Sequence, residues 1–355
     1  MITKKMNKFL EEILEQPCAL GNTFNYYINS EGKNLLESVK KAIYEKNIEQ
    51  IIFTGMGSSY FTSHAASNLF NGLNINSFVI NASELLHYNL SLLERKTLLI
   101  CFSQSGESFE VQEILKKLPS STYCVGITNE EESTLGKKAD IALHSKGGKE
   151  EMTSTKTYVS TALVSFILGW YLSGNWNNNK INMIKHLIEN FKTTLTDYNY
   201  WVDDALEFLG ELPALQIIAR GPVFSTACQS ALMFKEATGI PATGNLGGEF
   251  RHGPMEMVKE GFKSILFAAK GKTLSQSIKM AEDIAEFGGK VLLITNAKLQ
   301  LPNKNIMLIF IDEQDEYLFS IQSIIPVQLL IDSYTKAKGY EAGSFSCGAK
   351  VTLTE

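Results

Sequence analysis

The chain of 355 residues contains few cysteines, and they stand far apart in the sequence. None belongs to a C-x-x-C pair, and their number, five, is odd. This pattern argues against a disulfide framework and a thiolate metal cage, and it favours a reducing, cytoplasmic location. The histidines form no H-x-x-x-H pair and have no cysteine partners, so a metal site is not expected. No cofactor is expected either. The cysteines are Cys18, Cys101, Cys124, Cys228 and Cys347.

Long apolar runs are also missing. The most apolar helix-like stretch, residues 159–172, has 14 residues, fewer than the roughly 20 that a membrane span needs. We expect it to form a buried core helix. The N-terminal segment MITKKMNKFLEEILEQPC has acidic residues where a signal peptide would need an apolar run. It therefore predicts an amphipathic helix rather than a secretion signal.

Neither sign of charge is in large excess. Lys and Arg total 33, Asp and Glu total 38, and no long run of like charge occurs. Nucleic acid and membranes are therefore not expected partners, whereas small molecules and further copies of the chain are. Hydrophobic residues make up 44% and charged residues 20%, which is typical of a soluble globular protein. At roughly 150 residues per domain, the length predicts about two domains.

An internal repeat recurs at an offset of 166 residues. IIFTG at 51–55 matches IIARG at 217–221, and TLLICF from Thr97 matches KSILFA from Lys263. ADIAL at 139–143 matches NIMLI at 305–309 in the same frame. Each half thus has short apolar runs separated by segments of helical period, the pattern of parallel strands joined by crossover helices.

The repeat predicts an α/β fold with two tandem, doubly wound parallel sheets. Strands are expected near 50–54, 97–102, 123–128 and 140–143, and near 215–219, 263–268, 290–295 and 306–311. The predicted organisation is an N-terminal helical segment at 1–47, a first domain at 48–175, a helical connector at 176–208, a second domain at 209–338 and a C-terminal tail at 339–355.

Hydroxyl-rich loops follow two strands of the first half. Gly55–Ser59 reads GMGSS, and Ser103–Ser108 reads SQSGES and leads into a helical segment. Ligands bind at the carboxyl ends of parallel strands, and hydroxyls with unpaired N–H groups at a helix start can hold a phosphate. Helix capping is the alternative, and taken alone it is the better explanation. Neither loop is a Walker motif or G-x-G-x-x-G, so nucleotide binding has no specific support.

A third cluster, TSTKT at Thr153–Thr157, opens the apolar helix. Its hydroxyls could hydrogen-bond a polyhydroxylated ligand, and helix capping is again the alternative. The second half offers ionisable groups: Glu236 late in a helical segment, and Glu249, Arg251 and His252 in a glycine-rich loop. A carboxylate with a histidine meets the needs of proton transfer at a sugar carbon. Glu236 and His252 are 16 residues apart, so only the fold can bring them together.

Several segments, in their order and spacing, resemble the SIS (sugar isomerase) family over nearly the whole chain. The resemblance is strongest to the isomerase half of glucosamine-6-phosphate synthase. The segments are LEEILEQPCALGNTF, GMGSSY, SQSGES, the STK cluster, KEATGIPATGNLGGEFRHGP, PVQLL and AKVTLTE.

The resemblance implies a role for each matching residue. Glu236 matches the residue that moves a proton between C1 and C2, and His252 matches the ring-opening acid/base, contributed by a neighbouring subunit of a homodimer. Lys350 matches the lysine of a tail that closes over the open-chain sugar. The implied substrate-binding residues are Ser103, Gln104, Ser105 and Ser108 for the phosphate, with Ser58 and Ser59 nearby, and Ser154 and Ala349 for the sugar.

The sequence departs from the synthase in ways that leave the substrate open. The chain begins near the isomerase half, so glutamine-dependent synthesis is not expected of this polypeptide alone. Met233 stands where the synthase has a lysine, and the tail reads GSFSCGAK. Cys347 in that tail is expected to be an inert small residue rather than a redox thiol.

Three functions remain open on this resemblance. The leading one is a phosphosugar isomerase that deaminates an amino-sugar 6-phosphate. The alternatives are a fructosamine-6-phosphate deglycase and a non-catalytic sugar-phosphate sensor. The absence of a basic helix-turn-helix region disfavours the sensor.

Overall fold

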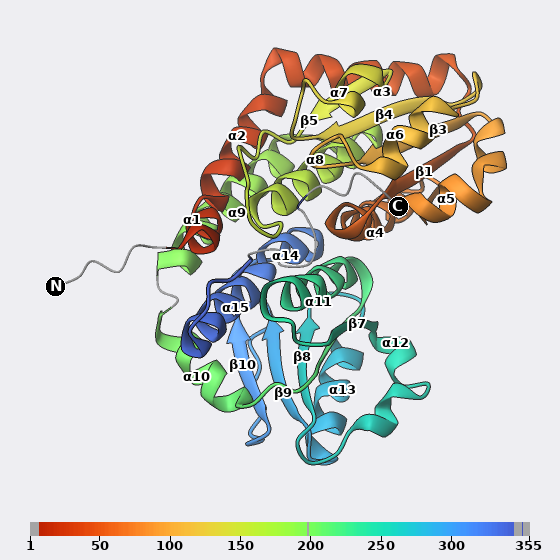
Figure 1. Ribbon diagram of the computed structural model, residues 1–355. Coiled ribbons are helices and arrows are strands. Elements are labelled where there is room, and N and C mark those ends of the chain that lie inside the picture. The colour runs from red at the N-terminus through yellow and green to blue at the C-terminus, as the bar shows by residue number, and fades with distance from the viewer. Residues whose placement is uncertain (1–6, 197–198, 344–349, 351–355) are drawn as a thin grey trace. The chain divides into compact units, whose positions relative to one another are not determined.

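The computed structural model describes residues 7–196, 199–343 and 350 (Figure 1). The chain divides into two compact units, each built around one sheet. The first sheet unit comprises Gln16–Glu150, Ser154–Ile184 and Ser346–Glu355. The second sheet unit comprises Met1–Glu15, Glu151–Thr153 and Lys185–Phe345. The two tandem parallel sheets that the repeat predicts are confirmed.

The first sheet has five parallel strands in the order β2-β1-β3-β4-β5. β3 is buried along its whole length, as expected for a strand covered on both faces. The strands are β1 (Gln50–Gly55), β2 (Ser77–Asn81), β3 (Thr97–Phe102), β4 (Tyr123–Thr128) and β5 (Ile141–His144). The helices are α2 (Gln16–Ile28), α3 (Ser30–Glu45), α4 (Gly57–Gly72), α5 (Ala82–Tyr88), α6 (Phe109–Lys116), α7 (Thr134–Lys138) and α8 (Lys156–Leu172), with the 3-10 helix η1 (Leu90–Glu94).

Successive side chains of each strand point to opposite faces of the first sheet, so the two faces contribute to two different hydrophobic cores. One face, with Ile52 and Leu99, packs under α5, α6 and α7. On the other face Phe53 meets Phe70 of α4 edge to face, with ring centroids 4.9 Å apart. α8, which contacts both α2 and α4, is apolar on all sides and almost entirely buried. The buried core helix expected at 159–172 is thereby confirmed.

The second sheet repeats this design in the order β10-β9-β8-β6-β7. Ile218, Leu266 and Leu293 form a core with α12 and α13, and α11 packs against α15. The strands are β6 (Leu215–Ala219), β7 (Ala242–Leu246), β8 (Lys263–Ala268), β9 (Lys290–Thr295) and β10 (Ile306–Phe310). The helices are α1 (Lys8–Leu14), α10 (Asn199–Leu209), α11 (Phe224–Thr238), α12 (Gly247–Phe250), α13 (Leu274–Glu286), α14 (Glu316–Gln322) and α15 (Ile324–Lys338), with η2 (Gly221–Val223) and η3 (Pro254–Met257); α9 (Asn178–Thr196) crosses the boundary between the units.

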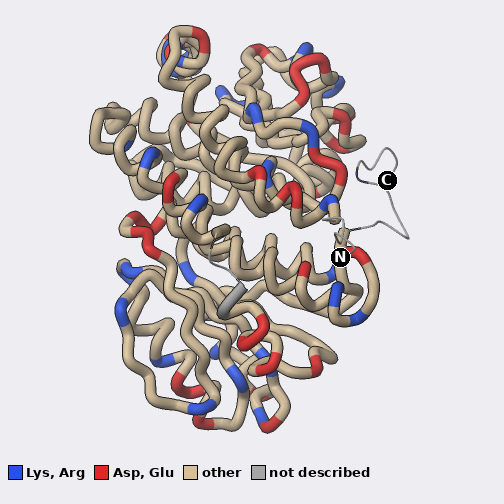
Figure 2. Tube along the Cα trace, turned by 90° about the vertical axis from the view of Figure 1, so that its left-hand side faces the viewer, with Lys and Arg blue, Asp and Glu red and all other residues tan. Residues whose placement is uncertain are grey.

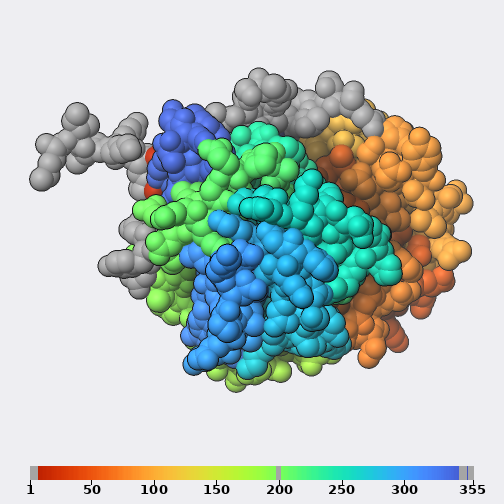
Figure 3. Space-filling view, turned by 90° about the horizontal axis from the view of Figure 1, so that it is seen from below, coloured from red at the N-terminus to blue at the C-terminus, as the bar shows by residue number. Residues whose placement is uncertain are grey.

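The surface of both units is mixed in charge. Figure 2 shows acidic and basic residues interspersed along the trace of each unit. Figure 3 looks onto the end of the second sheet unit where its strands begin, and side chains from the cyan and blue segments close that end. Among the described residues, no helix is both long and apolar enough to cross a membrane.

The eight predicted strands are present, each within one residue at either end. The sequence analysis missed β2 and β7, each of which lies at an edge of its sheet beside the first strand of its half. β7 reads ATGNL, and Gly and Asn are depleted in strands. When the repeat offset is added to the number of the first residue of β2, the result lies within one residue of the start of β7. The repeat therefore relates the two strands that the sequence analysis missed.

Candidate functional site

The order of strands in the first sheet creates a crevice at its carboxyl edge. From β1 the chain crosses to β2 on one side and later continues to β3 on the other, so α4 and α6 leave for opposite faces of the sheet while the loops after β1 and β3 begin side by side. These two loops are the hydroxyl-rich segments Gly55–Ser59 and Ser103–Ser108. Gly55 lets them approach, because a Cβ there would lie 2.9 Å from the Phe102 carbonyl oxygen. The sheet thus brings together two segments that the sequence left apart.

The loop after β3 is a tight turn held by its own hydroxyls. Ser103 Oγ accepts a hydrogen bond from Gly106 N at 3.1 Å, and Ser105 Oγ accepts one from Glu107 N at 3.2 Å. Ser108 occupies the N-cap position of α6, yet its side chain makes no capping hydrogen bond and lies 3.3 Å from Ser103 Oγ. Helix capping therefore does not explain Ser108.

Glu107 anchors this loop from outside, a role that the sequence analysis did not identify. Its carboxylate accepts hydrogen bonds from Thr134 N at 2.6 Å and from Thr134 Oγ1 at 2.8 Å. Gln112 Nε2 donates a further bond at 2.9 Å. The serine loop is thus tied to the start of α7 and to α6. On the other side of the crevice, Ser58 and Ser59 lie in the first turn of α4.

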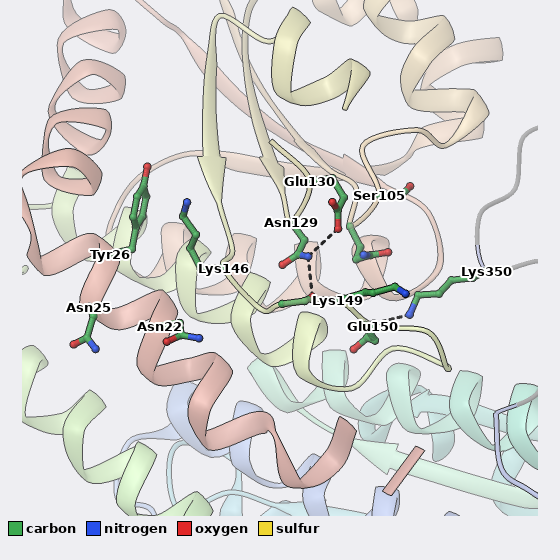
Figure 4. Close-up of a pocket in the computed structure, with 12 residues that line it drawn as sticks. Asn22, Asn25, Tyr26, Ser105, Asn129, Glu130, Lys146, Lys149, Glu150 and Lys350 are labelled. Carbon is green, nitrogen blue, oxygen red and sulfur yellow. Dashed lines mark hydrogen bonds and ion pairs between the residues drawn. The ribbon is translucent and has the colours of Figure 1, made fainter. Parts of the chain in front are cut away.

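A cavity of about 980 Å³ opens beside the serine loop (Figure 4). Gln104 and Ser105 line it, and so does Lys350 from the C-terminal tail. Three predicted site residues therefore share one cavity of the first sheet unit. The other lining residues follow β4 and β5 or project from α2: Asn129, Glu130, Lys146, Gly148, Lys149, Glu150, Asn22, Asn25 and Tyr26.

Asn129 fixes the floor of this cavity. Its Nδ2 donates to Gly148 O at 3.0 Å, and its Oδ1 accepts from Gly147 N at 2.8 Å. The loop after β5 is thereby held against the end of β4. At the α2 side, the Tyr26 hydroxyl donates to Glu31 Oε1 at 3.0 Å. Burial, reinforced by this bond, raises the pKa of Tyr26, so its phenol stays neutral.

Glu150 is the most highly coordinated side chain of the site. Its carboxylate accepts hydrogen bonds from Thr155 N at 2.9 Å, Thr157 N at 3.1 Å and Thr157 Oγ1 at 2.6 Å. Lys350 Nζ forms an ion pair with Glu150 Oε2 at 2.9 Å, drawn as a dashed line in Figure 4. A carboxylate at the start of α8 is favourable because it meets unpaired N–H groups and the positive end of the helix dipole.

The sequence analysis did not identify Glu150, and its pairing with Lys350, 200 residues away, follows from no local pattern. Ser154, a predicted sugar contact, is partly buried, and its hydroxyl lies 2.9 Å from Thr157 Oγ1. Ala349 and Cys347 lie outside the described residues.

The predicted acid/base residues belong to the second sheet unit. Glu236 lies in the last turn of α11, partly buried, and its Oε2 accepts a hydrogen bond from Thr153 Oγ1. His252 follows α12 on an exposed turn, as expected of the glycine-rich loop. Its assignment to a site on a neighbouring subunit stays a prediction.

The second sheet has a matching crevice between the loops after β6 and β8, but a side chain occupies it. The Glu316 carboxylate lies against Gly271, where a Cβ would come within 2.7 Å of Oε2, and it also approaches Gly221. Burial raises the pKa of Glu316, although nearby Lys272 opposes this shift. An anion bound there would meet a carboxylate, so the first sheet is the better candidate for an anion site. Within the described residues, no group of three or more His, Cys, Asp or Glu side chains is arranged to hold a metal.

The SIS domain family model matches the chain twice, at residues 43–168 and 212–331. The chain belongs to the SIS domain family. The resemblance stated from the sequence is thereby confirmed, and each SIS segment contains one of the two sheets.

Relatives and solved structures agree with this membership. The chain is 28% identical over 338 residues to glutamine–fructose-6-phosphate aminotransferase (isomerizing) of Pyrococcus horikoshii, an alignment that covers 93% of this chain and 55% of the relative. The chain thus spans about half the length of the curated relatives it matches.

Two solved structures share the fold. The C-terminal domain of glucosamine-fructose-6-phosphate aminotransferase from Francisella tularensis superposes with a TM-score of 0.85 at 22% identity, covering 97% of this chain and 99% of that one. Glucosamine-6-phosphate deaminase from Thermotoga maritima gives a TM-score of 0.73 at 21% identity, with the same coverage.

Proposed function

We propose that this SIS protein is a phosphosugar isomerase that acts on an amino-sugar 6-phosphate and releases ammonia. The observation that carries the proposal is the shared cavity, in which the serine loop and Lys350 face the same space. The loop supplies hydroxyls and backbone N–H groups for a phosphate, and the lysine supplies a cation for the oxygen or nitrogen functions of the sugar. Family membership supports the same substrate class.

In the proposed mechanism, Glu236 takes the proton from one sugar carbon and returns it to the neighbouring carbon. His252 opens the ring by proton transfer to and from the ring oxygen. Lys350, held by Glu150, stabilises negative charge that develops on the open-chain intermediate. Removal of the carbon-bound proton gives an enolamine, and return of the proton to the neighbouring carbon gives a ketimine. A water molecule adds to the ketimine carbon, and cleavage of its C–N bond releases ammonia and leaves a ketose phosphate.

A second candidate function is a deglycase that splits fructosamine 6-phosphates into a hexose phosphate and an amine. The size of the cavity favours it: about 980 Å³ lies near the top of the range of roughly 300–1,000 Å³ for ligand pockets. Asn22 and Asn25 line the side formed by α2 and would offer amide groups to an amine substituent.

A substrate panel separates the candidates. The full chain is incubated with hexosamine 6-phosphates and fructosamine 6-phosphates, and ammonia, free amine and hexose phosphate are measured. Ammonia from a hexosamine 6-phosphate supports the deaminase, whereas hexose phosphate from ketosamines alone supports the deglycase. Binding without turnover of any compound would refute both and favour a sugar-phosphate sensor.

Glu236→Gln provides the matched catalytic control for this panel. We expect turnover to fall by about 10²- to 10⁴-fold, because an amide cannot accept the carbon-bound proton. Binding of the sugar phosphate, measured by calorimetry, should stay within a few-fold of the wild type. Near-normal turnover would remove Glu236 from the mechanism.

A further inference from the structure

Thr153 makes a hydrogen bond that local sequence does not explain. Its hydroxyl donates to Oε2 of Glu236, 83 residues further along the chain. Both residues belong to the second sheet unit, and Thr153 is only 1% exposed. A buried hydroxyl therefore faces the one carboxylate to which the proposed reaction assigns the carbon-bound proton.

The backbone that leads into Thr153 is held firmly in place. The Glu12 carboxylate of α1, itself fully buried, accepts hydrogen bonds from Glu151 N at 2.6 Å and Met152 N at 3.2 Å. Gly343 packs so closely on Met152 that a Cβ there would lie 3.2 Å from Met152 Cβ. Because its backbone is pinned, Thr153 cannot follow Glu236 if that side chain rotates.

α1 is itself tied down, so Glu12 is a fixed anchor. Asn7 caps the helix by accepting from Leu10 N at 2.8 Å, and its Nδ2 donates to Asp332 Oδ1 of α15 at 2.7 Å. The contacts form a continuous path: α15 holds α1, Glu12 holds the 151–153 segment, and Thr153 holds the carboxylate.

We propose that Thr153 is a positioning residue that orients the Glu236 carboxylate for proton transfer. The inference rests on the proposed function, because it assumes that Glu236 is the base. A donor bonded to Oε2 fixes the plane of the carboxylate, which otherwise rotates easily about its last torsion. The same bond stabilises the ionised form, the only form that can accept a proton from carbon.

Three substitutions separate orientation from folding. Thr153→Val removes the hydroxyl and keeps the shape, whereas Thr153→Ser keeps a donor. Thr226→Val is the matched control: Thr226 is buried on α11, the helix that carries Glu236, and its hydroxyl donates to Ser320 O at 2.5 Å. Thr226→Val thus deletes a buried hydroxyl from this helix without touching Glu236.

We expect Thr153→Val to lower kcat by about 10- to 100-fold, the effect of losing a hydrogen bond to a charged group, while KM changes little. Thr153→Ser should retain most of kcat, and Thr226→Val should match the wild type after correction for folded protein. The acid limb of the kcat/KM profile should move to higher pH only in Thr153→Val, because the carboxylate loses a donor that favours its ionised form. A purely structural role would lower kcat by the same factor at every pH.

An infrared measurement tests the same bond without turnover. The difference spectrum between the protein and its Glu236→Gln variant isolates the carboxyl band of Glu236, and that band is followed as a function of pH. In the Thr153→Val background it should protonate at higher pH than in the wild-type background. An unchanged titration, or equal kcat losses in Thr153→Val and Thr226→Val, would overturn the inference. Lack of turnover by the wild type on the whole panel would instead refute the proposed function, and the infrared titration would still decide whether Thr153 controls Glu236.

Discussion

The Glu150 carboxylate bonds both to N–H groups at the start of a helix and to a lysine of the C-terminal tail. One oxygen accepts from the backbone N–H groups of Thr155 and Thr157, and the other meets Lys350. The side chain is fully buried, so each of these bonds replaces a lost bond to water. The placement of Lys350 at the cavity therefore depends on a residue that also accepts hydrogen bonds at the start of α8.

Glu150→Gln tests this dependence. The amide keeps an acceptor for the two N–H groups but turns a donor toward the Lys350 ammonium, so the ion pair is lost. We expect the free energy of unfolding to fall by about 1–3 kcal/mol and kcat to fall more than KM rises.

The matched control for Glu150→Gln is Glu131→Gln. Glu131 pairs with Lys146 at the surface, so its loss should change stability by less than about 1 kcal/mol. Equal effects of the two substitutions in urea unfolding and in kcat would contradict the role assigned to Glu150.

Glu313 predicts a pH dependence of stability. It is 2% exposed, and burial raises the pKa of its carboxyl despite hydrogen bonds from Gln314 N and Asp315 N. Because the folded-state pKa is raised, the contribution of Glu313 to the free energy of unfolding is fully present below its unfolded-state pKa, about 4.3. That contribution is lost as the pH rises through the folded-state pKa. Glu313→Gln should therefore gain stability relative to the wild type as the pH rises above the unfolded-state pKa. Urea unfolding at several pH values measures this gap, and a constant gap would show that Glu313 does not titrate differently on folding.

Site residues that follow a strand could be predicted from the sequence, and those that act across the fold could not. Ser103 to Ser108 stand directly after an apolar run, so their place at the carboxyl edge follows from the parallel sheet. Thr153 was grouped with its neighbours as a candidate helix cap, yet its bond to Glu236 depends on how α1 and α11 pack. The two residues of such a hydroxyl–carboxylate pair have no characteristic spacing in the sequence.

At the scale of elements, strand prediction succeeded wherever burial is two-sided. β3, β4, β8 and β9 are apolar runs because helices cover both faces, and the predicted bounds of all four are those observed. β2 and β7 lie at sheet edges and carry polar residues, so their apolar signal is weak. The hydrophobic pattern of a strand thus depends on how many faces of the sheet are covered by helices, as well as on the strand conformation itself.

Gly106, in the turn between β3 and α6, should tolerate replacement by alanine much less well than Gly174. Gly106 has φ +65°, and a Cβ there would lie 1.9 Å from Ser133 Oγ; Gly174 has φ +75° with open space around it. Gly174→Ala should cost only backbone strain, about 1–2 kcal/mol. Gly106→Ala should cost about 1–3 kcal/mol more from the clash, and it should weaken sugar-phosphate binding because the serine loop must shift. Urea unfolding with calorimetric binding checks both, and equal losses in the two variants would contradict the clash.

At the scale of the whole molecule, the resemblance to the synthase predicts that His252 completes the site of a neighbouring subunit in a dimer, and its exposed turn is compatible with that prediction. Glu236→Gln and His252→Ala proteins should each be inactive. If each site takes His252 from the other subunit, a mixed dimer has one site with both changes and one with neither. Unfolding and refolding an equal mixture should then restore about a quarter of wild-type activity. A mixture that stays inactive would place His252 in the site of its own chain.

The carboxylate of Glu316 makes the crevice of the second sheet different from the crevice of the first. A carboxyl group that belongs to the chain is always present at the second crevice, whereas a phosphate would have to be bound from solution. The second copy of the fold therefore needs no ligand to complete its crevice. The segment that stands there in the place of the serine loop reads AKGKT at 269–273 and contains no serine.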